Sequence, residues 1–395
     1  MKDVYVVEGA RTAVARAGKQ SWFTNVRAEA LAATVFKALR EKAGLTDKAK
    51  QAEIIDDVSW ATTANAFMEQ GLNVGRLAWI LSDGSYDVPA STIDRFCASG
   101  LNSIQHSIST MMCGWGGDVQ FAGGVQHMSH IPMGAGADLH PELGNYMNLQ
   151  AINMGYTAEI VARRYNISRE EQDELAMNSH LKATKAQQDG KFVRIVPITA
   201  VVPKKDGTTE EMVVAKDQGV RPETTMESLG KMAPVFMQDE KATVTAGNAS
   251  QINDASAGVV LATAEGAKKL GLKPIMKMKA CTFVGLEPDV MGIGPAIAVP
   301  KVLKIAGLTI DQIDLWEINE AFASQAAYCC NTLKLPKDRT NIWGSGISIG
   351  HPLACTGARI AVDILHMFEE TDAKYIVETM CIGHGQGAAA IWERA

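Results

Sequence analysis

Cys97 is the first residue whose type and surroundings could carry chemistry. It lies in the stretch RFCASG, after an apparent strand and before a predicted helix. Free backbone N–H groups and the helix dipole stabilise a thiolate at a helix N-terminus, so a cysteine there can act as a nucleophile. The alternative is a small buried apolar residue, which is the usual role of a lone cysteine.

His351 stands between a glycine and a proline in GHP. An imidazole held in such a turn could deprotonate a thiol, because its ordinary pKa is close to neutral pH. We predict that His351 occupies in the second half of the chain the place that Cys97 occupies in the first. The alternative is a histidine that only forms hydrogen bonds within a loop.

Cys381 follows an apparent strand and begins the stretch CIGHGQG. Successive glycines expose backbone N–H groups that can bind a developing oxyanion, as acyl transfer requires. A buried structural thiol is the alternative. The stretch does not fit a dinucleotide-binding fingerprint, which needs a following helix and an acidic residue about 20 residues further on.

Asn319 and Glu320 lie in EINEAF, between a strand-like run and an apolar helical run. Asn319 could position a water molecule or a substrate carbonyl. The alternative is that Asn319 caps the helix and that Glu320 interacts favourably with the helix dipole.

A metal site is the remaining chemical candidate. His127 and His130 are three residues apart, but no pair of cysteines accompanies them. Metal sites are usually indicated by closely spaced pairs of ligands, so we predict that the chain holds no metal.

The elements that must position these residues alternate between strands and helices. Short runs rich in Val and Ile, such as 4–7 and 119–122, predict buried strands. Apolar residues recur with helical spacing over 27–43, and another helix is expected over about 357–368. This alternation predicts an α/β fold.

Two units of strand, small-residue turn and helix recur, one around Cys97 and one around His351. They predict an internal duplication, although a chance match of α/β units is an open alternative. Between the halves, 131–143 is rich in Gly and Pro and 204–211 is charged, so neither stretch is expected to continue the alternation. We interpret this region as an inserted loop subdomain, with an ordinary helical subdomain as the alternative. The predicted boundaries are 1–124 plus 246–273 for the first half, 125–245 for the inserted subdomain and 274–395 for the second half.

Composition restricts the class of protein. The 395 residues are 47% hydrophobic and 21% charged, with a net charge of −6. This composition excludes a disordered chain, and the absence of a basic patch argues against nucleic acid as a partner. No run approaches the roughly 18 apolar residues of a membrane span. Seven scattered cysteines and the lack of a signal-like N-terminus or a peroxisomal C-terminus favour the cytoplasm.

Together the four motifs RFCASG, NEAF, GHP and CIGHGQG closely resemble the thiolase family. They occur in the expected order, and GARTAV at the start and TVTAGNAS extend the similarity over essentially the whole chain. The stretches HIPMGAGADLHPELG and NMGYTAE look most like bacterial 3-ketoacyl-CoA thiolases, particularly the β subunit of the fatty-acid oxidation complex.

The resemblance implies a five-layered αβαβα fold with two similar halves and an obligate dimer that can pair into a tetramer. It implies an acyltransferase of fatty-acid degradation, which cleaves 3-ketoacyl-CoA with CoA into acetyl-CoA and a shortened acyl-CoA by a ping-pong cycle. CoA would be a co-substrate, with no permanently bound cofactor. A hydratase and dehydrogenase α subunit would be a possible partner.

Site residues follow from the same resemblance. Cys97 would attack the keto carbon, His351 would activate it, and Cys381 would protonate the departing acetyl-CoA. Asn319 would hold a water that forms one oxyanion hole with His351. The backbone N–H groups of Cys97 and Gly383 would form the other.

Three further positions match CoA-binding positions of the family. Ser250 would contact the pantetheine arm, Arg221 would lie near the adenine and phosphates, and Met154 would line the acyl and pantetheine tunnel.

Departures from the family pattern leave the substrate open. The chain has NMG at Asn153 where acetoacetyl-forming thiolases commonly have HMG, which favours the degradative branch. His384 replaces a usual glycine or leucine, and Ser345 also departs from the motif. The alternatives are an acetoacetyl-CoA thiolase, a thiolase for an unusual acyl group and a non-catalytic CoA-binding scaffold. Cys381 argues against decarboxylating ketoacyl synthases, which use His or Asn there.

Overall fold

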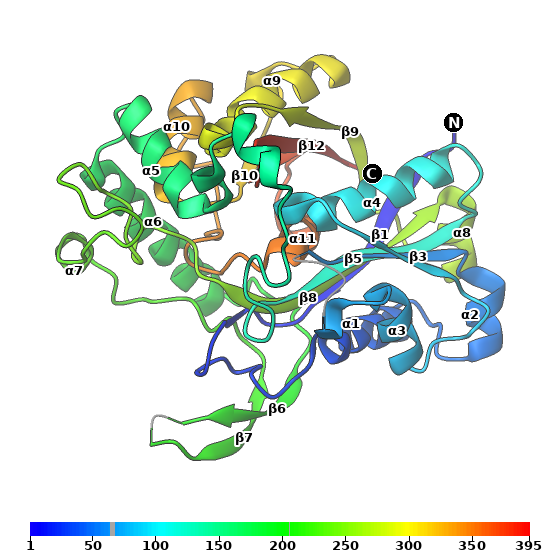
Figure 1. The fold of residues 1–395 in the computed structure, drawn as a ribbon. Coiled ribbons are helices and arrows are strands. Elements are labelled where there is room, and N and C mark those ends of the chain that lie inside the picture. The colour runs from blue at the N-terminus through cyan, green and yellow to red at the C-terminus, as the bar shows by residue number, and fades with distance from the viewer. Residues whose placement is uncertain (64–67, 205) are drawn as a thin grey trace.

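The structure is a computed structural model that describes residues 1–63, 68–204 and 206–395. A large mixed sheet runs through the molecule, with helices on both of its faces and between its two halves (Figure 1). The sheet has 10 strands, and its main path has the order β10-β11-β12-β9-β1-β8-β5-β3-β4.

The first half of the sheet contains most of the N-terminal strands. Its members are β1 (Val4–Arg11), β2 (Ala15–Arg16), β3 (Asp57–Ala61), β4 (Ala90–Ile93), β5 (Val119–His127) and β8 (Asn253–Thr263). Strand β3 runs parallel to β5, and β8 pairs antiparallel with both β5 and β1.

The second half repeats this arrangement. Its members are β9 (Met276–Gly285), β10 (Leu315–Ile318), β11 (Tyr375–Ile382) and β12 (Gln386–Arg394). Strand β10 runs parallel to β11, and β12 pairs antiparallel with both β11 and β9. The halves join where β1 pairs with β9, at Tyr5 with Lys277 and Val6 with Met276. The predicted duplication is therefore confirmed by the sheet topology.

Helices form three layers around the two half-sheets (Figure 1). The central layer contains α4 (Ser99–Met112) and α11 (Thr356–Glu370), and the main apolar core surrounds these two helices. One outer layer contains α1 (Ala28–Lys42), α2 (Lys48–Ile54), α3 (Val74–Leu81) and α8 (Ala264–Leu270), and the other contains α9 (Gly294–Ala306) and α10 (Ala323–Leu333). The predicted αβαβα layering is confirmed.

Helix α1 shows why the sequence pattern was informative. Leu31, Val35 and Leu39 recur with helical spacing, and all three are buried against the sheet. The helix begins at Ala28, whose N–H donates to Glu69 Oε1 at 2.8 Å. This bond satisfies one of the free N–H groups of the first turn.

Helices α4 and α11 touch backbone to backbone. A Cβ atom on Gly100 would lie 2.7 Å from Ala358 N, and one on Gly357 would lie 2.5 Å from Leu101 N. Only glycine permits this approach. The N-terminal ends of the two central helices are consequently held side by side.

The inserted region combines helices, a small sheet and long connecting segments. It contains α5 (Met154–Arg164), α6 (Arg169–Gln188), α7 (Met226–Gly230) and a separate sheet of β6 (Ile198–Pro203) and β7 (Thr209–Val214), which projects from the body in Figure 1. Strand β7 begins inside the charged stretch 204–211, so the prediction that this stretch ends the alternation is wrong from Thr209 onward; residue 205 lies outside the described residues. The polar side chains of β7 are tolerated because they are largely exposed.

Short 3₁₀ helices connect the main elements. They are η1 (Met68–Gln70), η2 (Phe96–Ala98), η3 (Pro141–Asn145), η4 (Leu149–Ile152), η5 (Pro288–Ile293), η6 (Ile310–Gln312) and η7 (Leu353–Cys355). Within the described ranges, no helix combines the length and the apolar character needed to cross a membrane.

Candidate active site

Cys97 lies in η2, directly before α4, as predicted for a cysteine at a helix N-terminus. Its side chain is buried. Burial raises the pKa of the Cys97 thiol to about 11, although the backbone N–H groups of Gly383 and of Cys97 itself act in the opposite direction. These two N–H groups therefore face the sulfur, which places the loop after β11 beside the nucleophile.

His351 is held by its backbone and by its ring. Its backbone N–H donates to Asn253 Oδ1 at 2.7 Å, and its ring Nδ1 lies 2.6 Å from Thr356 Oγ1. The Thr356 hydroxyl donates to Pro352 O at 3.1 Å, so its oxygen accepts the proton on Nδ1. The lone pair of the imidazole is therefore on Nε2. Burial, and after it the charge of Arg359, lowers the pKa of His351 to about 3, so the ring is a neutral base at pH 7.

Asn319 lies beside this imidazole. Its Nδ2 is 3.3 Å from His351 Nδ1 and 3.4 Å from Nε2, and its Oδ1 is a buried acceptor that has no partner within the described ranges. A buried orphan acceptor usually binds water. The helix-cap interpretation is wrong, because α10 begins only at Ala323 and Phe322 occupies its N-cap position.

Cys381 is one of the last two residues of strand β11 and does not belong to the loop after it. It lies in β11 opposite Gly387, because the ladder between β11 and β12 continues to Ile382. The thiol is buried. Burial, and after it the neighbouring Cys97, raises the pKa of Cys381 well above its usual range. The two thiols therefore share one site.

The predicted equivalence of His351 and Cys97 is wrong in register. Cys97 lies two residues before α4, and Ala354 is the residue two before α11. His351 lies three residues further upstream, directly before the turn in which Pro352 O accepts the N–H of Cys355, and the same turn occurs in the first half, where Arg95 O accepts the N–H of Ala98. Packing of η2 against η7 nevertheless brings the two helix ends together.

Met154 meets the loop that carries Gly383. A Cβ atom on Gly383 would lie 3.3 Å from Met154 Sδ and 3.9 Å from Phe96 Cγ. The Phe96 ring packs edge to face on His384, with the ring centroids 4.6 Å apart. The inserted subdomain therefore contributes Met154 to a wall that stands beside Cys97.

The two other predicted CoA-binding residues lie further from the thiols. Ser250 is half-buried, and its N–H donates to Ala321 O at 2.9 Å, beside the stretch that follows Asn319. Arg221 is attached to α6, since its N–H donates to His180 Nδ1 at 3.2 Å. Burial, and after it the charge of Arg16, lowers the pKa of Arg221, which indicates that the two guanidinium groups are neighbours.

Sequence reasoning did not single out three residues of this site: Thr356, Asn253 and Arg16. Thr356 carried a weak signal, because a hydroxyl at the start of the helix after GHP can reach back to the histidine. Asn253 and Arg16 carried none, since each reaches the site only through pairing of distant segments: β2 pairs with β8 at Arg16 and Asn253.

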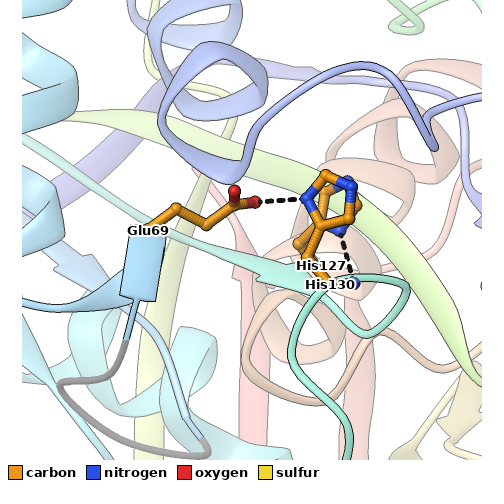
Figure 2. A group of neighbouring side chains, drawn as sticks. All are labelled: Glu69, His127 and His130. Atoms are coloured by element: carbon orange, nitrogen blue, oxygen red, sulfur yellow. Dashed lines mark hydrogen bonds and ion pairs between the residues drawn. The ribbon is translucent and has the colours of Figure 1, made fainter.

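A second cluster contains Glu69, His127 and His130, and its three side chains converge in Figure 2. The two imidazole rings are stacked, with centroids 4.0 Å apart and planes 25° apart. A metal ion must lie near the plane of each ring that binds it, and two stacked rings have no such common point. His130 Nδ1 instead lies 3.0 Å from Glu69 Oε1 and its Nε2 lies 2.9 Å from Thr24 O. Both ring nitrogens of His130 face hydrogen-bond acceptors, so this arrangement favours a protonated imidazole over a metal ligand.

Comparison with known proteins identifies the family. The model of the thiolase N-terminal domain matches residues 4–265, and that of the thiolase C-terminal domain matches residues 272–394. The chain therefore belongs to the thiolase family and is an acyltransferase.

Relatives align over the full chain. The chain is 41% identical to a 3-ketoacyl-CoA thiolase of Marinobacter nauticus, an alignment that covers 100% of this chain and 98% of the relative. It is 40% identical to a 3-ketoacyl-CoA thiolase of Bacillus subtilis, with 100% of both chains covered. Among solved structures, the acetyl-CoA acetyltransferase of Bacillus anthracis superimposes with a TM-score of 0.87 at 33% identity, covering 100% of this chain and 99% of that one.

Proposed function

We propose that the chain is a 3-ketoacyl-CoA thiolase that shortens acyl chains by two carbons in fatty-acid degradation. The observation that carries this proposal is the meeting of two buried thiols, Cys97 and Cys381. The packing of η2 against η7 adds the neutral imidazole of His351, which lies directly before Pro352 and η7. A nucleophile, a base and a second acid are the groups that carbon–carbon bond cleavage and thioester exchange require. The names of the full-length relatives support the choice of substrate class.

In the first half-reaction, Cys97 Sγ attacks the 3-keto carbon while His351 Nε2 takes the thiol proton. The oxyanion is stabilised by the water at Asn319 and by His351. The bond between C2 and C3 then breaks, and Cys381 gives its proton to C2 of the departing enolate. The products are acetyl-CoA and a thioester on Cys97.

In the second half-reaction, the thiol of CoA attacks that thioester. Its proton passes to the Cys381 thiolate, and the N–H groups of Cys97 and Gly383 bind the oxyanion. The bond to Cys97 breaks, and the sulfur regains its proton from His351. Every catalytic group has then returned to its starting protonation state, which completes a ping-pong cycle.

CoA is proposed as a co-substrate rather than a permanently bound cofactor. Arg221 and its neighbour Arg16 would bind its phosphates, because two adjacent guanidinium groups form a site for polyanions. Ser250 would contact the pantetheine arm, and Met154 would line the tunnel to Cys97.

Assembly and location are proposed from the same family. We expect a homodimer or a dimer of dimers, with a hydratase and dehydrogenase α subunit as a candidate partner that supplies the substrate. The seven cysteines all lie in described residues and are free thiols, which fits a reducing cytoplasm.

An acetoacetyl-CoA thiolase is the second candidate, supported by the name of the Bacillus anthracis structure. A steady-state assay separates the two functions. With CoA and a series of 3-ketoacyl-CoA substrates, the proposed enzyme releases acetyl-CoA and the shortened acyl-CoA in equal amounts, and longer chains have the higher kcat/KM. Activity on acetoacetyl-CoA alone would favour the second candidate, and no activity on any member would contradict both.

A further inference from the structure

His384 places an imidazole beside the nucleophile that the proposed reaction does not use. It directly follows Gly383, whose N–H faces the Cys97 sulfur. The side chain is exposed, and its ring packs edge to face on Phe96 at 4.6 Å. No residue in the described ranges forms a hydrogen bond with either ring nitrogen of His384.

Both residues of this aromatic pair have left-handed backbone. The φ angle is 46° at Phe96 and 62° at His384. This region is unfavourable for side chains such as Phe, and residues are held in it where the surrounding structure fixes them, often at ligand sites. The backbone around Cys97 and Gly383 thus determines where the two rings lie.

The wall next to the nucleophile is otherwise apolar. It contains the Phe96 ring, the Met154 thioether and the backbone of Gly383. An acyl group on Cys97 would direct its carbonyl oxygen to the two N–H groups, and its chain would pass along this wall. Among the side chains of His384, Phe96 and Met154, the His384 imidazole is the one that can donate a hydrogen bond.

The charges nearby favour a neutral ligand atom. Burial lowers the pKa of His384, and Asp94 acts in the opposite direction. The Asp94 carboxylate accepts the Phe96 N–H at 2.9 Å, so it lies at the base of the same wall. The Arg95 guanidinium keeps its charge, but it is held by Asn102 Oδ1 at 2.6 Å and over the Phe283 ring, with Cζ 4.2 Å from the ring centroid. A neutral imidazole next to a carboxylate disfavours an anionic acyl group.

We propose that His384, supported by Phe96, determines acyl specificity by donating a hydrogen bond to a neutral oxygen, a hydroxyl or keto group, on the acyl chain. This inference rests on the proposed function, because it requires an acyl group on Cys97. It assigns to the enzyme an oxygenated acyl chain as the favoured class of substrate.

The test compares pairs of 3-ketoacyl-CoA substrates of increasing length, each pair with and without a terminal hydroxyl group. The wild type is expected to have the higher kcat/KM for the hydroxylated member of at least one pair. His384→Gly, which suits the left-handed backbone, should reduce that preference, measured as the ratio of kcat/KM within each pair, about fivefold or more. His384→Leu provides a second variant, and His106→Leu, at an exposed position of α4, is its matched control.

Each outcome bears on one proposal. Equal loss for both members of a pair in the His384 variants, or no preference in the wild type, would overturn the role of His384. A wild-type preference for an acyl chain with a terminal carboxylate would contradict the inference that the group bound by His384 is neutral. Inactivity of the wild type on every substrate, hydroxylated or not, would contradict the proposed thiolase function instead.

Discussion

The Cys97 thiol and the His351 imidazole are both neutral in the free protein. Burial raises the pKa of Cys97 to about 11 and lowers that of His351 to about 3. A Cys97 thiolate paired with a protonated His351 is therefore unfavourable before substrate binds. In the proposed mechanism, a thiolate forms as the sulfur attacks, when the negative charge passes to an oxygen that hydrogen-bond donors stabilise. This arrangement limits unproductive reactions of the nucleophile.

Thr356 is a positioning residue for the base. Its hydroxyl accepts the Nδ1 proton of His351 at 2.6 Å and so fixes the lone pair on Nε2. Thr356→Val keeps the shape but removes this acceptor, so we expect kcat to fall roughly ten- to a hundredfold with little change in KM. Steady-state thiolysis measures the effect. Thr356→Ser restores the hydroxyl and should recover most of kcat; equal losses in both variants would indicate a packing defect.

At the residue scale, sequence reasoning found groups whose chemistry is visible in a motif. Cys97 and Cys381 were identified from helix-end and glycine-rich contexts. The cap interpretation of Asn319 failed, because three residues separate it from Ala323, where α10 starts. Asn253 was missed because its bond to His351 exists only in the folded chain.

The contact between α4 and α11 sets the geometry of the site at the scale of elements. A Cβ atom on Gly357 would lie 2.5 Å from Leu101 N, so Gly357→Ala must push the helices apart. We expect the free energy of unfolding to fall by roughly 1–3 kcal/mol. We also expect kcat to fall, by a larger fraction of its wild-type value than the free energy of unfolding does, because the catalytic groups at the two helix ends are displaced.

Denaturant unfolding and thiolysis assays together check this expectation. Gly230→Ala is the control, because no atom lies within 4 Å of a Cβ at that position. Wild-type kcat in Gly357→Ala would show that the helix contact does not position the catalytic groups.

The ion pair of His130 and Glu69 links three elements. Glu69 lies in η1, accepts the first N–H of α1 and holds His130 beyond the end of β5 (Figure 2). Burial opposes the charge of His130, but hydrogen bonds to Glu69 and Thr24 O outweigh it and raise the pKa of His130 above its ordinary value of 6.5. Because the folded-state pKa is the higher one, this stabilisation is fully present below about pH 6.5 and is lost as pH rises through the folded-state value.

Thermal unfolding against pH tests this linkage. We expect His130→Asn to lower Tm relative to wild type at acidic pH and to approach the wild-type value above the folded-state pKa. Glu69→Gln should flatten the pH dependence in the same way. A constant difference in Tm at every pH would contradict a charged His130.

Helices and strands whose own sequence shows a core-facing apolar pattern were predictable. Strands that are stabilised only by pairing with another strand were not. The helix predicted over 27–43 corresponds to α1, because its apolar stripe is complete in the sequence. Strand β7 was missed, since its exposed polar residues pair only with β6 and show no core-facing alternation.

At the scale of the whole molecule, the active site exists only where the two halves meet. Cys97 comes from the first half, whereas His351 and Cys381 come from the second. The pairing of β1 with β9 and the contact of α4 with α11 hold the halves together. The sequence repeat predicted this duplication, but only the structure revealed the shift of three residues between Cys97 and His351.

Trapping the acyl-enzyme tests the central claim most directly. Intact-protein mass spectrometry after mixing with 3-ketoacyl-CoA, without free CoA, should show the mass of the shortened acyl group, and peptide mapping should locate it on Cys97. Cys97→Ser should remain unmodified, whereas Cys381→Ser should acylate partially and slowly. An adduct on Cys381, or an unmodified wild type that still cleaves the substrate when CoA is added, would contradict the assignment of Cys97 as the nucleophile.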